Sequence, residues 1–198
     1  MALRREQSAT GVNTSFASTV TATFSNTLQI GSLIILAWEG DSATATNKAN
    51  TPTDTAGNTY VRAVSVVSSA VFDLEIWYAI NQKAQASNAV TVTDSLAGVD
   101  STLVIEEWTG ADSVTVLDKS SSATGSSTAL DSGNMVTLQP DLILWGAGAA
   151  AVGSSQLTVG AGYSNLTQTA TTFSNIACES QVVAATGQYK ATFGSASA

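Results

Sequence analysis

The residues of this sequence that could take part in chemistry are few, and one strand-like segment carries the most suggestive of them. Asp73, Glu75 and Trp77 alternate in the stretch FDLEIWYA, so they would share one face of a β-strand. An acid beside an aromatic ring can bind a sugar, and a retaining glycosidase needs two carboxylates about 5 to 5.5 Å apart. The alternative, which we favour, is an outward face of an antiparallel sheet, where acids keep the edges soluble.

Two further observations count against catalysis. Glu106 and Glu107 are neighbours that point to opposite faces of an ideal strand, so they cannot form a catalytic pair. The sequence also contains no histidine, which removes Ser-His-Asp and Cys-His arrangements and the commonest general base near neutral pH. We therefore predict that the chain is not an enzyme.

Calcium could be bound through oxygen atoms alone, without histidine. Possible ligands cluster at Asp41, Asp54 and Asn58, or at Asp131 and Asn134. None of them shows the D-x-[DN]-x-[DN]-G spacing of an EF-hand loop. We therefore predict no cofactor and leave calcium at Asp54 open.

The stretch DTAGNTY places Asp54, Gly57 and Asn58 close together before an apolar segment. It has no phosphate-binding glycine pattern, and no helix is expected after it. Gly57 or Asn58 can adopt a positive φ, and the Asp54 carboxylate can accept local backbone N–H groups. The stretch therefore predicts a tight turn that leads into a strand over residues 60–67.

Composition excludes several classes of partner. Charged residues make up only 11% of the chain, and the surface is predicted to be rich in hydroxyl groups because Ser and Thr together number 53. The net charge is -8, and the seven basic residues are scattered apart from one N-terminal pair. Nucleic acids and anionic membranes need a basic patch, so neither is expected as a partner. We also expect no Sec-type signal, because no apolar run follows the N-terminal basic residues.

The elements that would position these residues are β-strands. Apolar and polar residues alternate with period two in STVTATF, YVRAVSVV and FDLEIWYA, whereas helical periodicity is absent. SLIILAW is continuously apolar, as expected of a central strand that is covered on both sides. About ten such segments predict a single antiparallel β-sandwich, jelly-roll or lectin-like, over residues 16–198, preceded by an N-terminal arm over residues 1–15. The single cysteine, Cys178, is expected to be a buried and inert thiol.

The chain resembles a recurrent β-sandwich family of phage genomes and bacterial surface proteins in five segments. These segments are DTAGNTYVRAVSV, DLEIWYAINQKA, LVIEEWTGAD, GYSNLTQ and ESQVVAATGQYKATF. The resemblance spans about residues 28–193 and rests on turn and core signatures rather than on catalytic motifs. It implies a virion decoration, tail-associated or adhesive module. Members of that family usually continue into a final apolar strand that contains an aromatic residue, whereas this chain ends in GSASA. The resulting free edge could pair with the arm of a neighbouring chain.

We therefore expect a non-enzymatic structural protein of a virion or another extracellular assembly. The first expectation is a homo-oligomeric phage decoration protein that binds the major capsid protein or other virion subunits. A second possibility is an adhesive or carbohydrate-binding module in which Trp38, Trp77, Trp108 or Trp145 stacks on a sugar. A third is a filament subunit held together by strand exchange.

Overall fold

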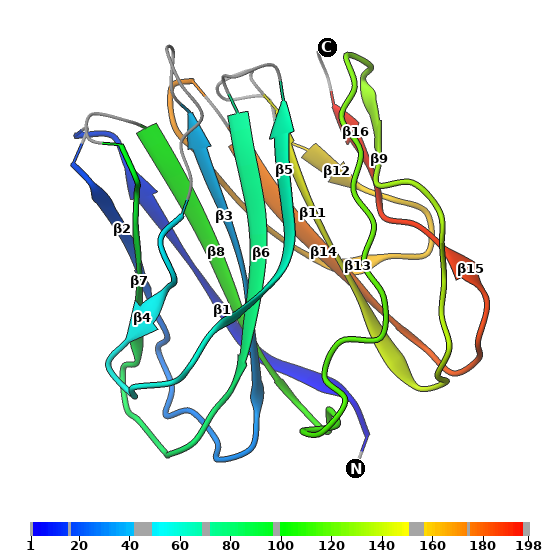
Figure 1. Cartoon of the computed structure of the whole chain (residues 1–198), viewed down its shortest axis with the longest axis horizontal. Helices are drawn as coiled ribbons and strands as arrows, with labels where there is room; N and C mark the ends of the chain where they lie inside the picture. The colour runs from blue at the N-terminus through cyan, green and yellow to red at the C-terminus, as the bar shows by residue number, and fades with distance from the viewer. Residues whose placement is uncertain are drawn as a thin grey trace.

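A computed structural model describes residues 2–15, 17–41, 49–68, 72–96, 100–150, 157–173 and 175–195 (Figure 1). These residues form sixteen strands in five sheets, every strand pairing is antiparallel, and none of them is helical. The strands are β1 (Arg4–Asn13), β2 (Thr19–Thr23), β3 (Leu33–Asp41), β4 (Thr53–Asp54), β5 (Val61–Ser68), β6 (Phe72–Ile80), β7 (Ala89–Thr93), β8 (Asp100–Thr109), β9 (Ala129–Asp131), β10 (Met135–Val136), β11 (Leu142–Ala150), β12 (Leu157–Val159), β13 (Ser164–Ala170), β14 (Asn175–Val183), β15 (Gln188–Tyr189) and β16 (Thr192–Ser195). No helix in this part of the chain has the length and apolar character that crossing a membrane requires.

The centre of the molecule is a five-stranded sheet in the order β1-β8-β3-β6-β5. Its middle strands β3 and β8 are buried along almost their whole length, because other sheets cover both of their faces. The continuously apolar stretch SLIILAW lies on β3, so the prediction of a central strand covered on both sides is confirmed.

One face of the central sheet is closed by the sheet β2-β7-β4. Val20 and Ala22 of β2 point inward against Leu36 and Trp38 of β3, while the threonines of β2 point to solvent. This arrangement is the half-buried strand with a threonine outer face that period-two alternation predicts. The resulting core contains the largest group of fully buried apolar side chains among the described residues.

The other face of the central sheet packs against the sheet β11-β14-β13. A third sheet, β12-β16-β9, covers the far side of β14, and the short pair β10-β15 lies beside it (Figure 1). β11 contains two glycines at positions where this layer approaches closely. A Cβ atom on Gly146 would lie 2.4 Å from Ala191 Cβ, and one on Gly148 would lie 2.6 Å from the Phe193 ring. Cys178 of β14 is fully buried, as predicted, and burial raises the pKa of its thiol.

The all-β, antiparallel class predicted from the sequence is confirmed, but its finer description is not. The strands divide into several small sheets rather than into a single sandwich of about ten strands. The N-terminal segment also differs from the expected arm, because Arg4–Asn13 forms β1 and pairs with β8 of its own chain. The polar sequence RREQSATGVN lacks strict alternation, so its pattern does not predict a strand.

Candidate functional site

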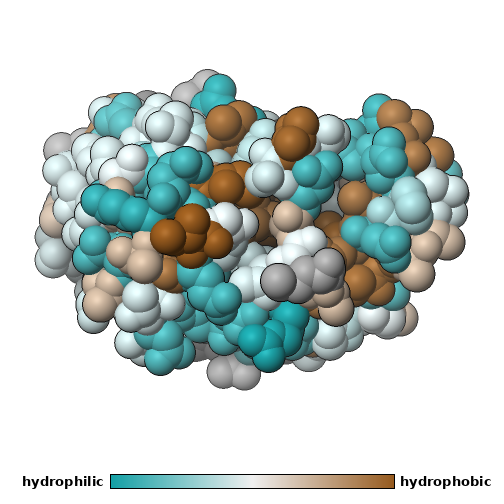
Figure 2. Space-filling view, turned by 90° about the horizontal axis from the view of Figure 1, so that it is seen from below, coloured by the Kyte–Doolittle hydropathy of each residue, from teal (hydrophilic) through white to brown (hydrophobic). Residues whose placement is uncertain are grey.

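A cleft of about 770 Å³ lies between the central sheet and β11. It exists because the two sheets are in contact along only part of their width. β13 and β14 lie against β1, β8 and β3, whereas β11 reaches β6 and leaves a gap beside the edge strand β5. Figure 2 shows the lower end of the molecule, where apolar surface gathers in a hollow on the right with polar residues around it.

The walls of the cleft are mainly apolar. Leu74, Ile76 and Tyr78 of β6 face Ile143 and Trp145 of β11 across it, and all five side chains are half-buried. A volume of several hundred cubic ångströms with apolar walls and few polar groups is typical of a binding site. The cleft is therefore the candidate functional site.

Residues 111–127, which we call the strap, cover one side of the cleft without forming a strand. Among the described residues, the strap makes no backbone-to-backbone hydrogen bond with the rest of the chain. Side chains hold it instead: Leu138 N donates to the Asp118 carboxylate at 2.7 Å, and Ser121 Oγ donates to Gly133 O at 3.1 Å. Val116 packs on the apolar wall, and the rest of the strap is rich in serine and small residues.

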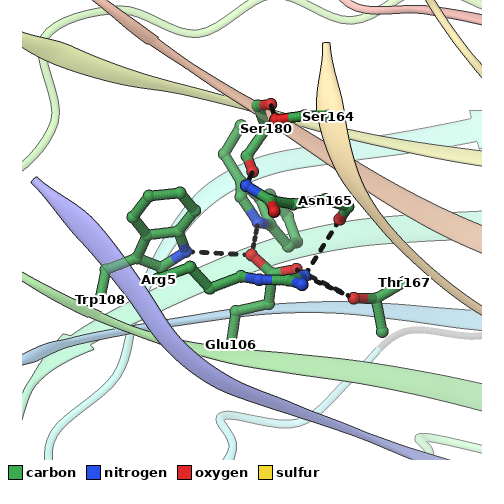
Figure 3. Close-up of polar contacts among 8 residues, drawn as sticks. Arg5, Glu106, Trp108, Ser164, Asn165, Thr167 and Ser180 are labelled. Carbon is green, nitrogen blue, oxygen red and sulfur yellow. Dashed lines mark hydrogen bonds and ion pairs between the residues drawn. The ribbon is translucent and has the colours of Figure 1, made fainter.

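The buried carboxylate of Glu106 fixes the back wall of the cleft (Figure 3). It accepts hydrogen bonds from Arg5 Nη1 at 2.9 Å, Trp145 Nε1 at 2.8 Å, Trp108 Nε1 at 3.0 Å and Thr167 Oγ1 at 3.2 Å. These donors come from β1, β11, β8 and β13, so one acid joins the central sheet to the second sheet. The indole ring of Trp145 is thereby held in a fixed orientation at the cleft wall.

The same network reaches the backbone of β13. Arg5 Nη1 also donates to Thr167 Oγ1 at 2.8 Å and to Asn165 O at 3.0 Å, and Asn165 Nδ2 donates to Ser180 Oγ at 3.2 Å (Figure 3). The guanidinium group therefore satisfies both the buried acid and a carbonyl oxygen of the neighbouring sheet. The contacts of Arg5 with Glu106 and with β13 lie on the side of the interface away from β5, where the two sheets touch each other.

Each of the four tryptophans donates its indole N–H group to a buried carboxylate. Trp108 and Trp145 share Glu106, as described above. Trp38 Nε1 donates to Asp94 Oδ1 at 3.0 Å, and Trp77 Nε1 donates to Glu75 Oε2 at 3.0 Å. Burial raises the pKa of Asp94 to about 6, and the hydrogen bonds from Ser101 and Trp38 oppose that rise.

The structure corrects the prediction for the acid and aromatic row of β6. Asp73, Glu75 and Trp77 are 1%, 0% and 6% exposed, and they face the β2-β7-β4 layer rather than solvent. Arg62 covers Trp77 and Glu75, with its guanidinium group 5.5 Å from the centroid of the Trp77 ring and 3.5 Å from Glu75 Oε2. Burial raises the pKa of Glu75, while Arg62 and Trp77 oppose the rise. The apolar residues Leu74, Ile76 and Tyr78 on the opposite face of β6 line the cleft.

Asp54 is at the centre of the predicted turn. Gly57 has φ +77° and donates its N–H to Asp54 O at 3.1 Å. The Asp54 carboxylate accepts hydrogen bonds from Asn58 N at 2.9 Å, Asn58 Nδ2 at 2.8 Å, Tyr60 Oη at 2.9 Å and Asn88 Nδ2 at 3.1 Å. Burial alone would raise the pKa of Asp54, but these hydrogen bonds together hold it below its ordinary value. The turn stabilises the end of the β2-β7-β4 sheet.

The other expected calcium ligands are also separate from one another. Asp131 pairs with Lys190 and accepts a hydrogen bond from Gly133 N at 2.8 Å. Asp41 lies opposite Asp100 in the β3–β8 ladder, and burial followed by the charge of Asp100 raises the pKa of Asp41. Within the described ranges, no group of three or more Asp, Glu or Cys side chains is arranged to hold a metal ion.

Comparisons with protein-family models, with curated proteins and with solved structures found no match for this chain. The resemblance to the phage and bacterial-surface family therefore stays a prediction. Sequence reasoning named Trp145 only as a possible sugar contact and Glu106 only as a rejected catalytic candidate, and it missed Tyr78 as a cleft residue. One available signal was the repeated E-x-W spacing at Glu75 and Glu106, because residues two apart share a strand face and an indole N–H needs an acceptor when buried.

Proposed function

We propose that this chain is a non-enzymatic structural protein of an extracellular particle and that it holds its partner in the cleft between β6 and β11. The first choice of role is a homo-oligomeric phage decoration protein that contacts the major capsid protein or another virion subunit. The cleft is the single observation that carries the proposal, because apolar side chains of β6 and β11 line it together with the serine-rich strap. The description of the fold as a jelly-roll or lectin-like sandwich belongs to the same proposal.

The use of the acids supports a binding role over a catalytic one. Glu106, Asp94, Glu75 and Glu179 are buried, and each accepts hydrogen bonds that connect strands or fix a tryptophan. Glu179, for example, accepts from Gly160 N at 2.7 Å and from Thr192 N at 3.1 Å. Carboxylates held in this way stabilise the layers of the molecule, and rigid layers suit a protein that works through shape.

A sugar-binding module is the second candidate, and the presence of Tyr78 and Trp145 in the cleft favours it. The other three tryptophans are buried in the protein interior, so they offer no exposed ring on which a sugar could stack. A glycan array probed with the purified chain tests this candidate, and binding that is lost when Tyr78 is replaced by alanine would support it.

Co-sedimentation with particles tests the leading proposal. Extracellular particles from cultures of the source organism are incubated with the purified chain and with the variants Val66→Arg and Val67→Arg. Val66 lines the cleft, whereas its neighbour Val67 points to the other face of β5 and does not. We expect the unmodified chain and the Val67→Arg variant to pellet with the particles and the Val66→Arg variant to stay in solution. A chain that remains a free monomer and is absent from the particles would contradict the proposal.

A further inference from the structure

We propose that the occupant of the cleft is an extended peptide segment of the partner protein, which adds as a new strand to the free edge of β11. The inference rests on the proposed function, since it names the part of the partner that the same cleft receives. Three features of the cleft carry it: the free edge, the spacing of the apolar side chains and the charge around the opening.

The edge of β11 runs along the cleft for its whole length. β11 pairs with β14 on one side, and the described residues provide no strand on its other side. All residues from 141 to 150 line the cleft, including those whose side chains point to opposite faces of the sheet. A cavity can contact both faces of a strand in this way only where it follows the edge of that strand.

The backbone of this edge has unused hydrogen-bonding capacity. In an antiparallel ladder, every second residue directs its N–H and C=O groups away from its partner strand. Within the described chain, the backbone of β11 makes no hydrogen bond beyond its ladder with β14. Such an edge inside an apolar cleft is a template for an added strand, because pairing satisfies polar groups that the cleft shields from water.

The apolar side chains beside this edge have the spacing of an extended peptide. Leu74, Ile76 and Tyr78 alternate along β6, and Ile143 and Trp145 alternate along β11. Alternate residues of a strand are about 6.5 to 7 Å apart, so an added strand would place every second side chain against the same row. The structure therefore assigns apolar residues to alternate positions of the bound segment.

The charge around the cleft favours a segment that carries basic residues. Asp112, Asp118, Asp131 and Asp141 line the cleft together with one basic residue, Lys119. Lys190 pairs with Asp131, which leaves the other three acids without an ion pair among the described residues. A segment with lysine or arginine at its ends matches this surface, and an acidic one is disfavoured.

The strap is the part of the molecule that would have to move. It makes no backbone ladder with β11 or β5, and its contacts with the residues after β9 are the side-chain hydrogen bonds of Asp118 and Ser121. Segments with few backbone hydrogen bonds and few apolar contacts open at low cost in free energy. An incoming strand can therefore displace the strap without disturbing the other layers, and of the three acids without an ion pair among the described residues, Asp141 lies outside the strap.

A defined peptide pool tests the proposal with the full chain. The probe is a pool of synthetic peptides of the length of β11, with Val, Ile, Leu or Phe at alternate positions, Thr between them and Lys at both ends. Two matched pools differ in one feature each: one has Glu at both ends, and one carries N-methyl groups on alternate backbone amides. We measure binding by fluorescence anisotropy and locate it by amide hydrogen exchange.

We expect the lysine-ended pool to bind and to protect amides of Leu142–Ala150 from exchange. The glutamate-ended and N-methylated pools should bind at least about tenfold more weakly. The Val66→Arg variant should lose affinity by a similar factor, while Val67→Arg should bind like the unmodified chain. Failure of the lysine-ended pool to bind, equal binding of the N-methylated pool, or protection outside β11 would each overturn the inference.

The result is separable from that of the particle experiment. If the particles retain the chain but the peptide pool does not bind, the proposed function stands and the strand-addition inference fails. If a small apolar dye binds the cleft and the N-methylated pool competes with it as well as the lysine-ended pool does, the cleft is an apolar pocket without strand addition, which also overturns the inference.

Discussion

The two faces of the central sheet are built from the same strands but are used differently. The face toward β2-β7-β4 is closed over β3, β6 and β8 by interlocking apolar side chains, with Trp38 and Leu36 fully buried. The face toward β11-β14-β13 is closed only on the side of β8 and β14, and it opens into the cleft over β6. The difference leaves part of the apolar surface of the central sheet uncovered on one face only.

The polar network around Glu106 holds the second interface closed on one side. It joins four strands at the closed side and holds Trp145 at the back of the cleft. β5 and β11 are edge strands of their sheets, and no described strand joins them. The order of the strands therefore leaves this side of the interface open.

The largest effect is expected for Glu106, because its loss would weaken the contact between the central sheet and the sheet β11-β14-β13. The Glu106→Ala substitution leaves Arg5 and two indole N–H groups without their acceptor, which should cost about 3 to 5 kcal/mol of unfolding free energy. Glu106→Gln is the matched control and should cost less, because it retains one acceptor oxygen. Urea unfolding measures both, and a loss below about 1 kcal/mol for Glu106→Ala would contradict the role given to this acid.

A pair of leucines compares the two faces directly. Leu36 of β3 is fully buried in the closed face, whereas Leu74 of β6 is half-buried and lines the cleft. Leu36→Ala should lower the unfolding free energy by about 3 kcal/mol, and Leu74→Ala by about 1 kcal/mol, because the lost contacts and the new cavity are smaller. Equal losses in chemical denaturation would show that the cleft side is packed as tightly as the core.

The buried acid of the closed face predicts a dependence on pH. Burial raises the pKa of Asp94 from an ordinary value of 3.8 to about 6, so the folded state takes up a proton that the unfolded state does not between these values. This group therefore makes the protein more stable as the pH falls through 6 toward 4, and less stable as the pH rises. Asp94→Asn should weaken that dependence without abolishing it, because burial also raises the pKa of Glu75. If thermal unfolding of the variant between pH 4 and 7 has the same slope as the unmodified chain, the assignment is wrong.

The smallest effects on stability are expected on β5, which is an edge strand. Val66→Arg and Val67→Arg should each change the unfolding free energy by about 1 kcal/mol or less, because an arginine side chain can extend to solvent from either face. Equal melting temperatures would also show that both variants are folded and can be compared in the binding experiments. Unfolding of the Val66→Arg variant alone would mean that this part of the cleft is a filled core.

Much of the fold follows from local patterns in the sequence. The alternating stretches STVTATF, YVRAVSVV and FDLEIWYA lie on β2, β5 and β6, and the turn with Gly57 at positive φ lies where DTAGNTY indicates it. Each of these features depends on residues that are close together in the sequence. Strand alternation and a glycine at positive φ can therefore be predicted from the local sequence. The short strands of two to four residues, such as β4 and β10, carry too little pattern to be recognised.

The site could not be predicted in the same way. Alternation on β6 shows that Asp73, Glu75 and Trp77 share a face, but it does not show which face a further sheet covers. The partners of Glu106 come from β1, β11 and β13, so their meeting depends on how distant segments stack. The cleft depends on the same stacking, because it is the part of the interface that the second sheet does not reach.

The indole N–H signals of Trp145 and Trp38 offer the most direct test that one face binds and the other is core. Each indole donates to a buried acid, Trp145 at the cleft and Trp38 in the closed face. An NMR titration of the isotope-labelled chain with the lysine-ended peptide pool should shift the Trp145 signal and leave the Trp38 signal unchanged. No shift of Trp145, or equal shifts of both signals, would contradict the account.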